Sequence, residues 1–210
     1  MKFPTTGLYA ITQTDHKAID TIIDEVAAAI RGGAAVVQYR DKNPIDAVRL
    51  ARELAGLCHR HDVPLIINDD VELAVQSGAD GVHLGKEDGH IIEARKRLGA
   101  NAIIGVSCYD SLKRAVEAEQ AGATYVAFGR FFPSSSKPLA APARIETLAQ
   151  ARRALRVPIV AIGGILPGNG APLLAAGADM LAVIGGIFDR HPEQSARAYQ
   201  PLFKGAPIPS

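Results

Sequence analysis

The sequence predicts an α/β protein built as one closed (β/α)8 TIM barrel, a single domain that spans residues 1–210. Three observations lead to this fold class. A Gly-Ala pair followed by an apolar run occurs four times, four further apolar runs fall between these repeats, and 48% of the residues are apolar. Apolar strands that alternate with helices indicate a parallel sheet covered on both faces. Eight such units predict closure into a barrel.

The four repeated segments contain the even-numbered strands. They share an Ala-rich helix end, a glycine and an apolar run, and they occupy residues 29–40, 74–85, 118–129 and 174–186. Their glycines are Gly33, Gly78, Gly122 and Gly177. Because helices often end at a glycine with positive φ, we expect each helix to end near its glycine and a buried strand to follow.

The odd-numbered strands are the remaining apolar runs, at residues 7–12, 64–69, 102–107 and 158–164. Helices fill the intervals. In the segment 44–61 the apolar residues recur at near-helical spacing, and Pro44 suits the first turn of that helix. A doubly wound open sheet is the alternative, but it would usually show a Gly-rich dinucleotide-binding turn after the first strand, and residues 8–17 contain none.

Composition excludes several classes of partner. The chain has 23 basic and 22 acidic residues, so bulk charge does not favour a nucleic acid or an anionic membrane. With only Cys58 and Cys108, the sequence predicts neither a disulfide framework nor a cysteine metal cluster. It contains no apolar run of membrane-spanning length and no signal peptide, so we expect a cytoplasmic protein. The oligomeric state stays open, with a homo-oligomer among the options.

Chemistry in such a barrel lies at the C-terminal ends of the strands, where the polar residues of this sequence gather. The second and third strands end in Gln38, Tyr39, Arg40, Asp41, Lys42, Asn68, Asp69 and Asp70. The fourth, fifth and sixth strands end in His83, residues 85–88, Ser107 and residues 128–138, and the last two end in Gly163-Gly164 and Gly185-Gly186.

Two of the acidic residues suit a metal ion. Asp69 and Asp88 follow neighbouring strands, so their carboxylates can converge, and hard oxygen ligands with open positions suit Mg²⁺. The alternative is that these acids cap the helices that follow, and this is the interpretation we favour for Asp70. Zinc is disfavoured, because no His or Cys group has ligand spacing.

The basic residues and glycines suit phosphorylated ligands. Arg40 and Lys42 lie two residues apart, so they point the same way in an extended segment, and with Lys137 they could surround a diphosphate. The glycine pairs after the last two strands suit a phosphate bound by backbone N–H groups. The alternatives are solvated surface charges and tight turns. His83 has no evident partner in sequence, and we interpret it as a packed, hydrogen-bonded histidine.

Five motifs in order resemble the thiamine-phosphate synthase family. They are QYRDK (38–42), NDDVELAVQSGADGVHLGKED (68–88), GVS (105–107), YVAFGRFFPSSSKP (125–138) and AIGGI (161–165). The resemblance implies a cytoplasmic, Mg²⁺-dependent transferase of thiamine biosynthesis. Such an enzyme joins an aminopyrimidine methyl pyrophosphate to a thiazole phosphate or its carboxylate. It releases pyrophosphate, and also CO₂ from the carboxylate form.

The resemblance also implies roles for individual residues. The pyrimidine pyrophosphate would be bound by Gln38, Tyr39, Arg40, Asp41, Lys42, Asn68, Ser107 and Lys137, of which Lys137, Ser107 and Arg40 would be catalytic. The thiazole phosphate would be bound by Ser134, Ser135, Ser136, Gly164, Ile184 and Gly185, and Mg²⁺ by Asp69 and Asp88. Family members often have Thr in the phosphate loop and Ser after the last strand, where this chain has Ser and Gly185.

Three other functions remain as alternatives. A thiazole tautomerase shares the barrel but does not need the full set of metal and pyrophosphate ligands. A sugar-phosphate isomerase or lyase usually needs a poised general base, and none is evident in the sequence. A non-catalytic barrel that binds thiamine intermediates is the third. The missing nucleophile–base pair suits a reaction that depends on electrostatic stabilisation of a departing anion.

Overall fold

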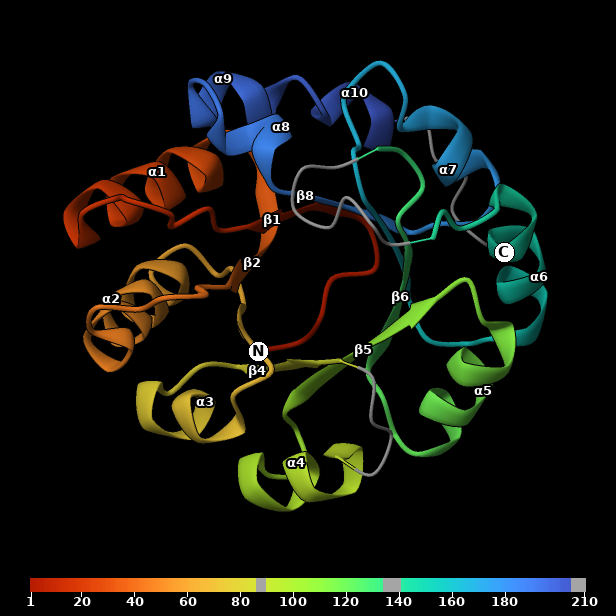
Figure 1. Ribbon diagram of the computed structural model, residues 1–210, viewed down its shortest axis with the longest axis horizontal. Coiled ribbons are helices and arrows are strands. Elements are labelled where there is room, and N and C mark those ends of the chain that lie inside the picture. The colour runs from red at the N-terminus through yellow and green to blue at the C-terminus, as the bar shows by residue number, and fades with distance from the viewer. Residues whose placement is uncertain (86–89, 134–140, 205–210) are drawn as a thin grey trace.

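Eight parallel strands close into a barrel in chain order (Figure 1). The structure is a computed structural model that describes residues 1–85, 90–133 and 141–204. The strands are β1 (Gly7–Ile11), β2 (Ala34–Tyr39), β3 (Leu65–Asn68), β4 (Gly81–Leu84), β5 (Ile103–Tyr109), β6 (Tyr125–Gly129), β7 (Ile159–Ile162) and β8 (Met180–Val183). Because β1 pairs with both β2 and β8, the barrel prediction is confirmed and the open sheet is excluded.

Helices surround the barrel and cover its outer face (Figure 1). They are α1 (Ile19–Arg31), α2 (Ala47–His59), α3 (Val71–Ser77), α4 (His90–Leu98), α5 (Leu112–Gln120), α6 (Ile145–Ala154), α7 (Ala171–Ala175), α8 (Gly185–Phe188), α9 (Pro192–Arg197) and α10 (Gln200–Phe203). No helix within the described ranges combines the length and the apolar character that a membrane span requires.

The start of α2 corrects one prediction. Pro44 lies in the loop before the helix and not in its first turn. The helix begins after Asp46, whose carboxylate accepts a hydrogen bond from the backbone N–H of Arg49 at 3.1 Å. An aspartate N-cap satisfies a helix N–H that has no intrahelical acceptor, and it therefore fixes the start of the helix. The glycine signals were right, since Gly33, Gly78, Gly122 and Gly177 all have positive φ.

Successive side chains along each strand point alternately to two cores, one between the barrel and the helices and one inside the barrel. Along β1, Leu8 and Ala10 pack outward against the helices, whereas Tyr9 and Ile11 point into the barrel. The buried residues of the inner core are Tyr9, Ile11, Val36, Ile66, Ile103, Tyr125, Ala127, Val160, Met180 and Ala182. Since both faces of each strand are buried, the continuous apolar runs of the sequence are explained.

The N-terminal segment closes one end of the barrel. In Figure 1 the N-terminus lies inside the ring of strands. The ring of Phe3 stacks on Tyr125 with the centroids 4.1 Å apart, and it meets Tyr9 edge-on at 6.2 Å. Phe3 precedes β1, so it fills the end of the barrel at which the strands begin. A binding site inside the barrel must therefore open at the C-terminal ends of the strands.

A glycine in β5 makes room for the inner core. A Cβ atom added at Gly105 would overlap the ring of Tyr125, with the nearest contact to the ring carbon Cζ. Tyr125 is fully buried and stacks on Phe3, and β6 pairs with β5 along this stretch, so the ring can shift only by giving up these contacts. The absence of a side chain at position 105 is thus a requirement of the barrel interior.

We expect Gly105→Ala to lower the free energy of unfolding by about 1–3 kcal/mol, because it overpacks the inner core. Gly56→Ala is the matched control. Gly56 lies within α2, and the nearest atom to its added Cβ is the guanidinium Nη1 of Arg60 at 3.5 Å. Removing a helix glycine at that position should raise stability by about 0.5–1 kcal/mol. Urea unfolding of both variants measures the contrast, and equal stability of Gly105→Ala and wild type would contradict it.

Candidate active site

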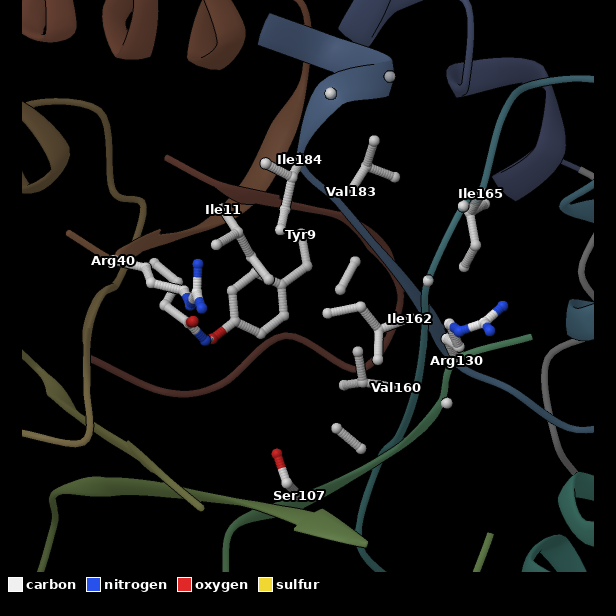
Figure 2. Close-up of a pocket in the computed structure, with 18 of the residues that line it drawn as sticks. Tyr9, Ile11, Arg40, Ser107, Arg130, Val160, Ile162, Ile165, Val183 and Ile184 are labelled. Carbon is white, nitrogen blue, oxygen red and sulfur yellow. Dashed lines mark hydrogen bonds between the residues drawn. The ribbon is translucent and has the colours of Figure 1, made fainter. Parts of the chain in front are cut away.

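A cavity of about 300 Å³ opens at the C-terminal ends of the strands (Figure 2). Its walls include Ile11, Val160 and Ile162, and Arg40 and Arg130 lie on opposite sides of it in Figure 2. The residues predicted from the sequence that line this cavity are Gln38, Arg40, Asn68, Ser107, Gly164, Ile184 and Gly185. They come from five different strand ends, so closure of the barrel is what brings them together.

Two tyrosines missed by sequence reasoning form the centre of the cavity floor. The hydroxyl oxygens of Tyr9 and Tyr125 lie 2.7 Å apart, and the side-chain amide of Gln38 donates to the Tyr9 hydroxyl at 2.9 Å. Both side chains line the cavity while being almost fully buried. Burial raises the pKa of Tyr9 and of Tyr125, so both phenols stay protonated at neutral pH.

His83 continues this network to Ser107. Its Nδ1 lies 2.9 Å from the Tyr125 hydroxyl and its Nε2 lies 2.9 Å from Ser107 Oγ. The histidine is 9% exposed, which confirms the prediction of a packed, hydrogen-bonded side chain. The hydrogen-bond partners of His83 could not be predicted from the sequence, because they lie 24 and 42 residues away along the chain. His83 also lines the cavity, so it belongs to the site itself.

A second, smaller cavity of about 190 Å³ lies beside the first and is lined mainly by polar residues. Its lining residues are Thr12, Gln13, Thr14, Asp15, Arg40, Lys42, Ile184 and Gly185. Arg40, Ile184 and Gly185 belong to both cavities. The Thr12 hydroxyl accepts from the Arg40 N–H at 2.9 Å and donates to the Arg40 carbonyl at 3.0 Å, so it fixes the backbone from which Arg40 projects.

Tyr39 and Asp41, which were also predicted as site residues, lie away from the two cavities. Neither residue lines either cavity. The Tyr39 ring packs in the core between the barrel and the helices, because strand alternation turns it away from the side on which Gln38 lies. Its hydroxyl donates to Asp41 Oδ2 at 3.4 Å, and Asp41 Oδ1 accepts from the Asn43 N–H at 3.0 Å. These two residues shape the loop that presents Arg40 and Lys42.

The two neighbouring aspartates after β3 have different surroundings. Asp70 caps α3, with its carboxylate accepting from the Leu73 N–H at 2.8 Å, as predicted. Asp69 has φ of 63° and donates its N–H to the His83 carbonyl at 2.8 Å. Its Oδ2 accepts from Asn68 at 2.8 Å, and its Oδ1 would lie 3.5 Å from a Cβ placed on Gly85. The Asp69 carboxylate therefore reaches the end of β4.

This arrangement fits a magnesium ion. No group of three His, Cys, Asp or Glu side chains that could hold a metal occurs in the described part of the chain. Mg²⁺ does not need such a cage, since it usually keeps waters and is bound through one or two carboxylates and substrate phosphates. The exposed carboxylate of Asp69, at the junction of β3 and β4, is a group of the kind that Mg²⁺ prefers. Asp88 lies outside the described residues.

Glycine pairs form the wall on the side of β7 and β8. Gly163 and Gly164 have φ of 106° and 63°, so the tight turn after β7 requires glycine. Gly185 and Gly186 begin α8, where the first N–H groups have no intrahelical acceptor. A Cβ at Gly185 would lie 3.1 Å from Cγ of Asp189, so the aspartate occupies the space beside this glycine.

The serine loop predicted after β6 lies outside the residues that the structure describes. Ser134, Ser135, Ser136 and Lys137 lie outside the described residues, so their predicted roles remain predictions. The residues that lead into the loop are described. Gly129, Arg130 and Pro133 all line the larger cavity. Pro133, the last described residue before residues 134–140, thus lies at the cavity.

Arg114 is a further residue that sequence reasoning missed. It projects from α5, and its guanidinium donates to the carbonyl of Ser107 at 2.9 Å and to that of Gly85 at 3.0 Å. One side chain thus joins the C-terminal ends of β4 and β5. An arginine in an amphipathic helix resembles any surface cation, so the sequence carried no signal of this role.

Comparison with known proteins agrees with the site. A family model described as thiamine monophosphate synthase matches residues 8–187. A thiamine-phosphate synthase of Nitrosococcus oceani is 50% identical over 206 residues, which cover 97% of this chain and 95% of that protein. One of Thiobacillus denitrificans is 53% identical over 185 residues and 87% of each chain.

Solved structures give the same result. A thiamine phosphate pyrophosphorylase from Pyrococcus furiosus superimposes with a TM-score of 0.86 at 32% identity, covering 96% of this chain and 97% of that one. A 3-hexulose-6-phosphate synthase reaches a TM-score of 0.70 at 18% identity, over 92% of this chain and 98% of the other, and shares the fold alone. The chain therefore belongs to the thiamine monophosphate synthase family and is a transferase of the thiamine-phosphate synthase type.

Proposed function

We propose that this enzyme couples 4-amino-2-methyl-5-(diphosphooxymethyl)pyrimidine to 4-methyl-5-(2-phosphooxyethyl)thiazole, or to its carboxylate. The products are thiamine monophosphate and pyrophosphate, with CO₂ lost from the carboxylate form. One observation carries the proposal. An apolar-walled cavity with a hydrogen-bonding floor adjoins a polar cavity, and Arg40 lines both. This combination suits a flat aminopyrimidine whose diphosphate must lie close to its ring.

The smaller cavity is our candidate for the diphosphate. It contains Arg40 and Lys42, and cations beside a departing anion stabilise the charge that develops on it. Thr12 and Thr14 add hydroxyl groups to its lining. Lys137, from the segment outside the description, is proposed as a third cation. The thiazole phosphate is assigned to the glycine-lined wall, where Gly164 and Gly185 adjoin the larger cavity, together with Ser134, Ser135 and Ser136.

The proposed chemistry is a dissociative substitution. The bond between the pyrimidine methylene carbon and the diphosphate oxygen breaks first, and the bonding electrons leave with pyrophosphate. The electron-rich aminopyrimidine carries the resulting cation. The lone pair of the thiazole nitrogen then forms the new C–N bond, so no side chain of the enzyme acts as a nucleophile. Holding the thiazole against this carbon supplies much of the rate enhancement by proximity.

Magnesium is the proposed cofactor, with Asp69 and Asp88 as its protein ligands. When bound, Mg²⁺ neutralises part of the diphosphate charge and so improves the leaving group. The contribution of the chain at this point is the orientation of Asp69. The Asn68 amide donates to Asp69 Oδ2, and the Asp69 N–H is fixed on the His83 carbonyl.

We expect the purified protein with Mg²⁺ to convert the two substrates to thiamine monophosphate. The product can be oxidised to a fluorescent thiochrome derivative and quantified after separation. A reaction without the thiazole phosphate serves as the control. Folded protein that yields no product above this control contradicts the proposed function.

Arg40→Ala should lower kcat/KM by more than about tenfold, since an electrostatic contact to developing charge is commonly worth about 3 kcal/mol. Arg40→Lys keeps the charge but loses the planar fork, so its activity should be intermediate. The control is Arg49→Ala, because Arg49 lies on the exposed face of α2 in an i,i+4 pair with Glu53. Its kcat/KM should stay within about twofold of wild type. Equal rates for Arg40→Ala and the control would remove Arg40 from the mechanism.

Asp69→Asn should raise the Mg²⁺ concentration needed for half-maximal activity, because a carboxylate ligand is replaced by a weaker amide. Asparagine tolerates the positive φ at this position, so the backbone should be kept. Asp70→Ala provides the contrast. It should cost about 1 kcal/mol of stability through loss of the α3 N-cap while the Mg²⁺ titration stays unchanged. A titration curve that shifts for Asp70→Ala and not for Asp69→Asn would reverse the assignment.

A further inference from the structure

The floor of the larger cavity contains an unbroken chain of hydrogen bonds. It runs from the Gln38 amide through the Tyr9 hydroxyl, the Tyr125 hydroxyl and the His83 ring to the Ser107 hydroxyl, with each step between 2.7 and 2.9 Å. Every interior member can both donate and accept. A chain of this kind has two self-consistent directions, and fixing the proton at one end fixes it at the other.

The Gln38 amide decides the direction. Its Nε2 group donates to the Tyr9 hydroxyl, so this oxygen accepts at that contact. The Tyr9 proton then has Tyr125 as its partner, because the ring is fully buried and its hydroxyl contacts are those to Gln38 and Tyr125. The opposite amide orientation would direct the NH₂ group of Gln38 away from Tyr9, toward the cavity that Arg40 also lines. The positive guanidinium favours the carbonyl oxygen on that side.

The remaining steps follow from proton counting. With Tyr9 donating to Tyr125, the Tyr125 proton is directed to Nδ1 of His83. A neutral imidazole that accepts at Nδ1 carries its own proton on Nε2, which then donates to Ser107 Oγ. The Ser107 oxygen is thereby used as an acceptor, and its hydroxyl proton is left for a group in the cavity, whose wall Ser107 forms.

We propose that Tyr9, Tyr125 and His83 are positioning residues that hold Ser107 as a hydrogen-bond donor and Gln38 as a carbonyl acceptor toward the pyrimidine. The proposal rests on the proposed function for the identity of the ligand. An aminopyrimidine offers an exocyclic amine, which donates, and ring nitrogens, which accept. The relay would therefore match the Gln38 oxygen to the amine and the Ser107 proton to a ring nitrogen. A pyrimidine with an oxo group in place of the amine presents the reverse pattern, and the site would reject it.

The proton on His83 can be located directly. We would label the protein with ¹⁵N-histidine and record the ring-nitrogen shifts of the free enzyme at neutral pH, where protonated and unprotonated nitrogens are well separated. The chain has six histidines, so loss of one set of signals in His83→Gln identifies those of His83. We expect a neutral ring with the proton on Nε2. A proton on Nδ1, or on both nitrogens, would overturn the proposal.

Gln38→Glu tests the relay over its full length. A carboxylate at position 38 can only accept, so Tyr9 must donate to it and every later bond must reverse. We expect the His83 proton to move from Nε2 to Nδ1, three hydrogen bonds from the substituted residue, and the Michaelis constant for the pyrimidine to rise by about tenfold or more. Ser77→Ala is the control, because it removes a buried hydroxyl that contacts the Ala74 carbonyl in α3. It should leave the His83 signals unchanged.

Tyr125→Phe supplies a second variant should the first fail to fold. It removes the hydroxyl that donates to Nδ1, so the preference for the Nε2 proton should be lost. The Michaelis constant for the pyrimidine should rise while that for the thiazole phosphate stays within about twofold, which a general loss of stability would not produce. His83 signals that are unchanged in a folded Gln38→Glu or Tyr125→Phe protein refute the relay. The proton positions are measured without substrates, so absence of coupling activity would count against the proposed function alone.

Discussion

A hydrogen bond between two tyrosine hydroxyls lies at the centre of this barrel, and both the core and the site depend on it. The rings of Tyr9 and Tyr125 fill the interior above Phe3, so they are part of the packing that closes the barrel floor. A buried hydroxyl is costly unless it is hydrogen-bonded. The two phenols therefore require polar partners at the level where the cavity begins, and Gln38 and His83 provide them. Gly105 is the complementary requirement, because any side chain there would occupy the place of the Tyr125 ring.

The sequence was sufficient for the architecture because each strand of a parallel barrel is buried on both faces. Apolar runs, spaced by helices that end near Gly33, Gly78, Gly122 and Gly177, have few other folds open to them. For the same reason, the sequence does not show which side chains of each strand face the interior of the barrel. In a run such as GLYAI, nothing in the sequence separates Tyr9, which faces the cavity, from Leu8, which faces the helices. The predicted start of α2 was wrong for a different reason. Pro44 and Asp46 both suit the start of a helix, and the helix begins directly after the residue whose side chain caps it, Asp46.

Alternation along the strand decides which of the residues predicted at the end of β2 line the cavity. Gln38 and Arg40 line the cavity, whereas Tyr39 between them turns outward, because alternation along the strand sends neighbours to opposite sides. His83 was placed correctly as a packed residue, but its contacts to Tyr125 and Ser107 join three strands and depend on barrel closure. Arg114 reaches Ser107 and Gly85 from a helix, so its role is visible only once α5 is docked.

The two cavities share Arg40, Ile184 and Gly185, so in the proposed reaction the cation and the departing anion would form in adjacent spaces. A cation formed in the larger cavity would face the apolar side chains of Ile11, Val160 and Ile162, which offer no lone pair to capture it. The departing pyrophosphate would lie in the smaller cavity, beside Arg40 and Lys42. Because the Arg40 guanidinium lines both cavities, it would keep the cation and the pyrophosphate close together. In such surroundings the attacking group must be supplied by the second substrate. The described lining does contain a hydrogen-bonded Ser107–His83 pair, but in the proposed relay Nε2 of His83 donates to Ser107 Oγ, so the histidine cannot act as the base that would turn this serine into a competing nucleophile.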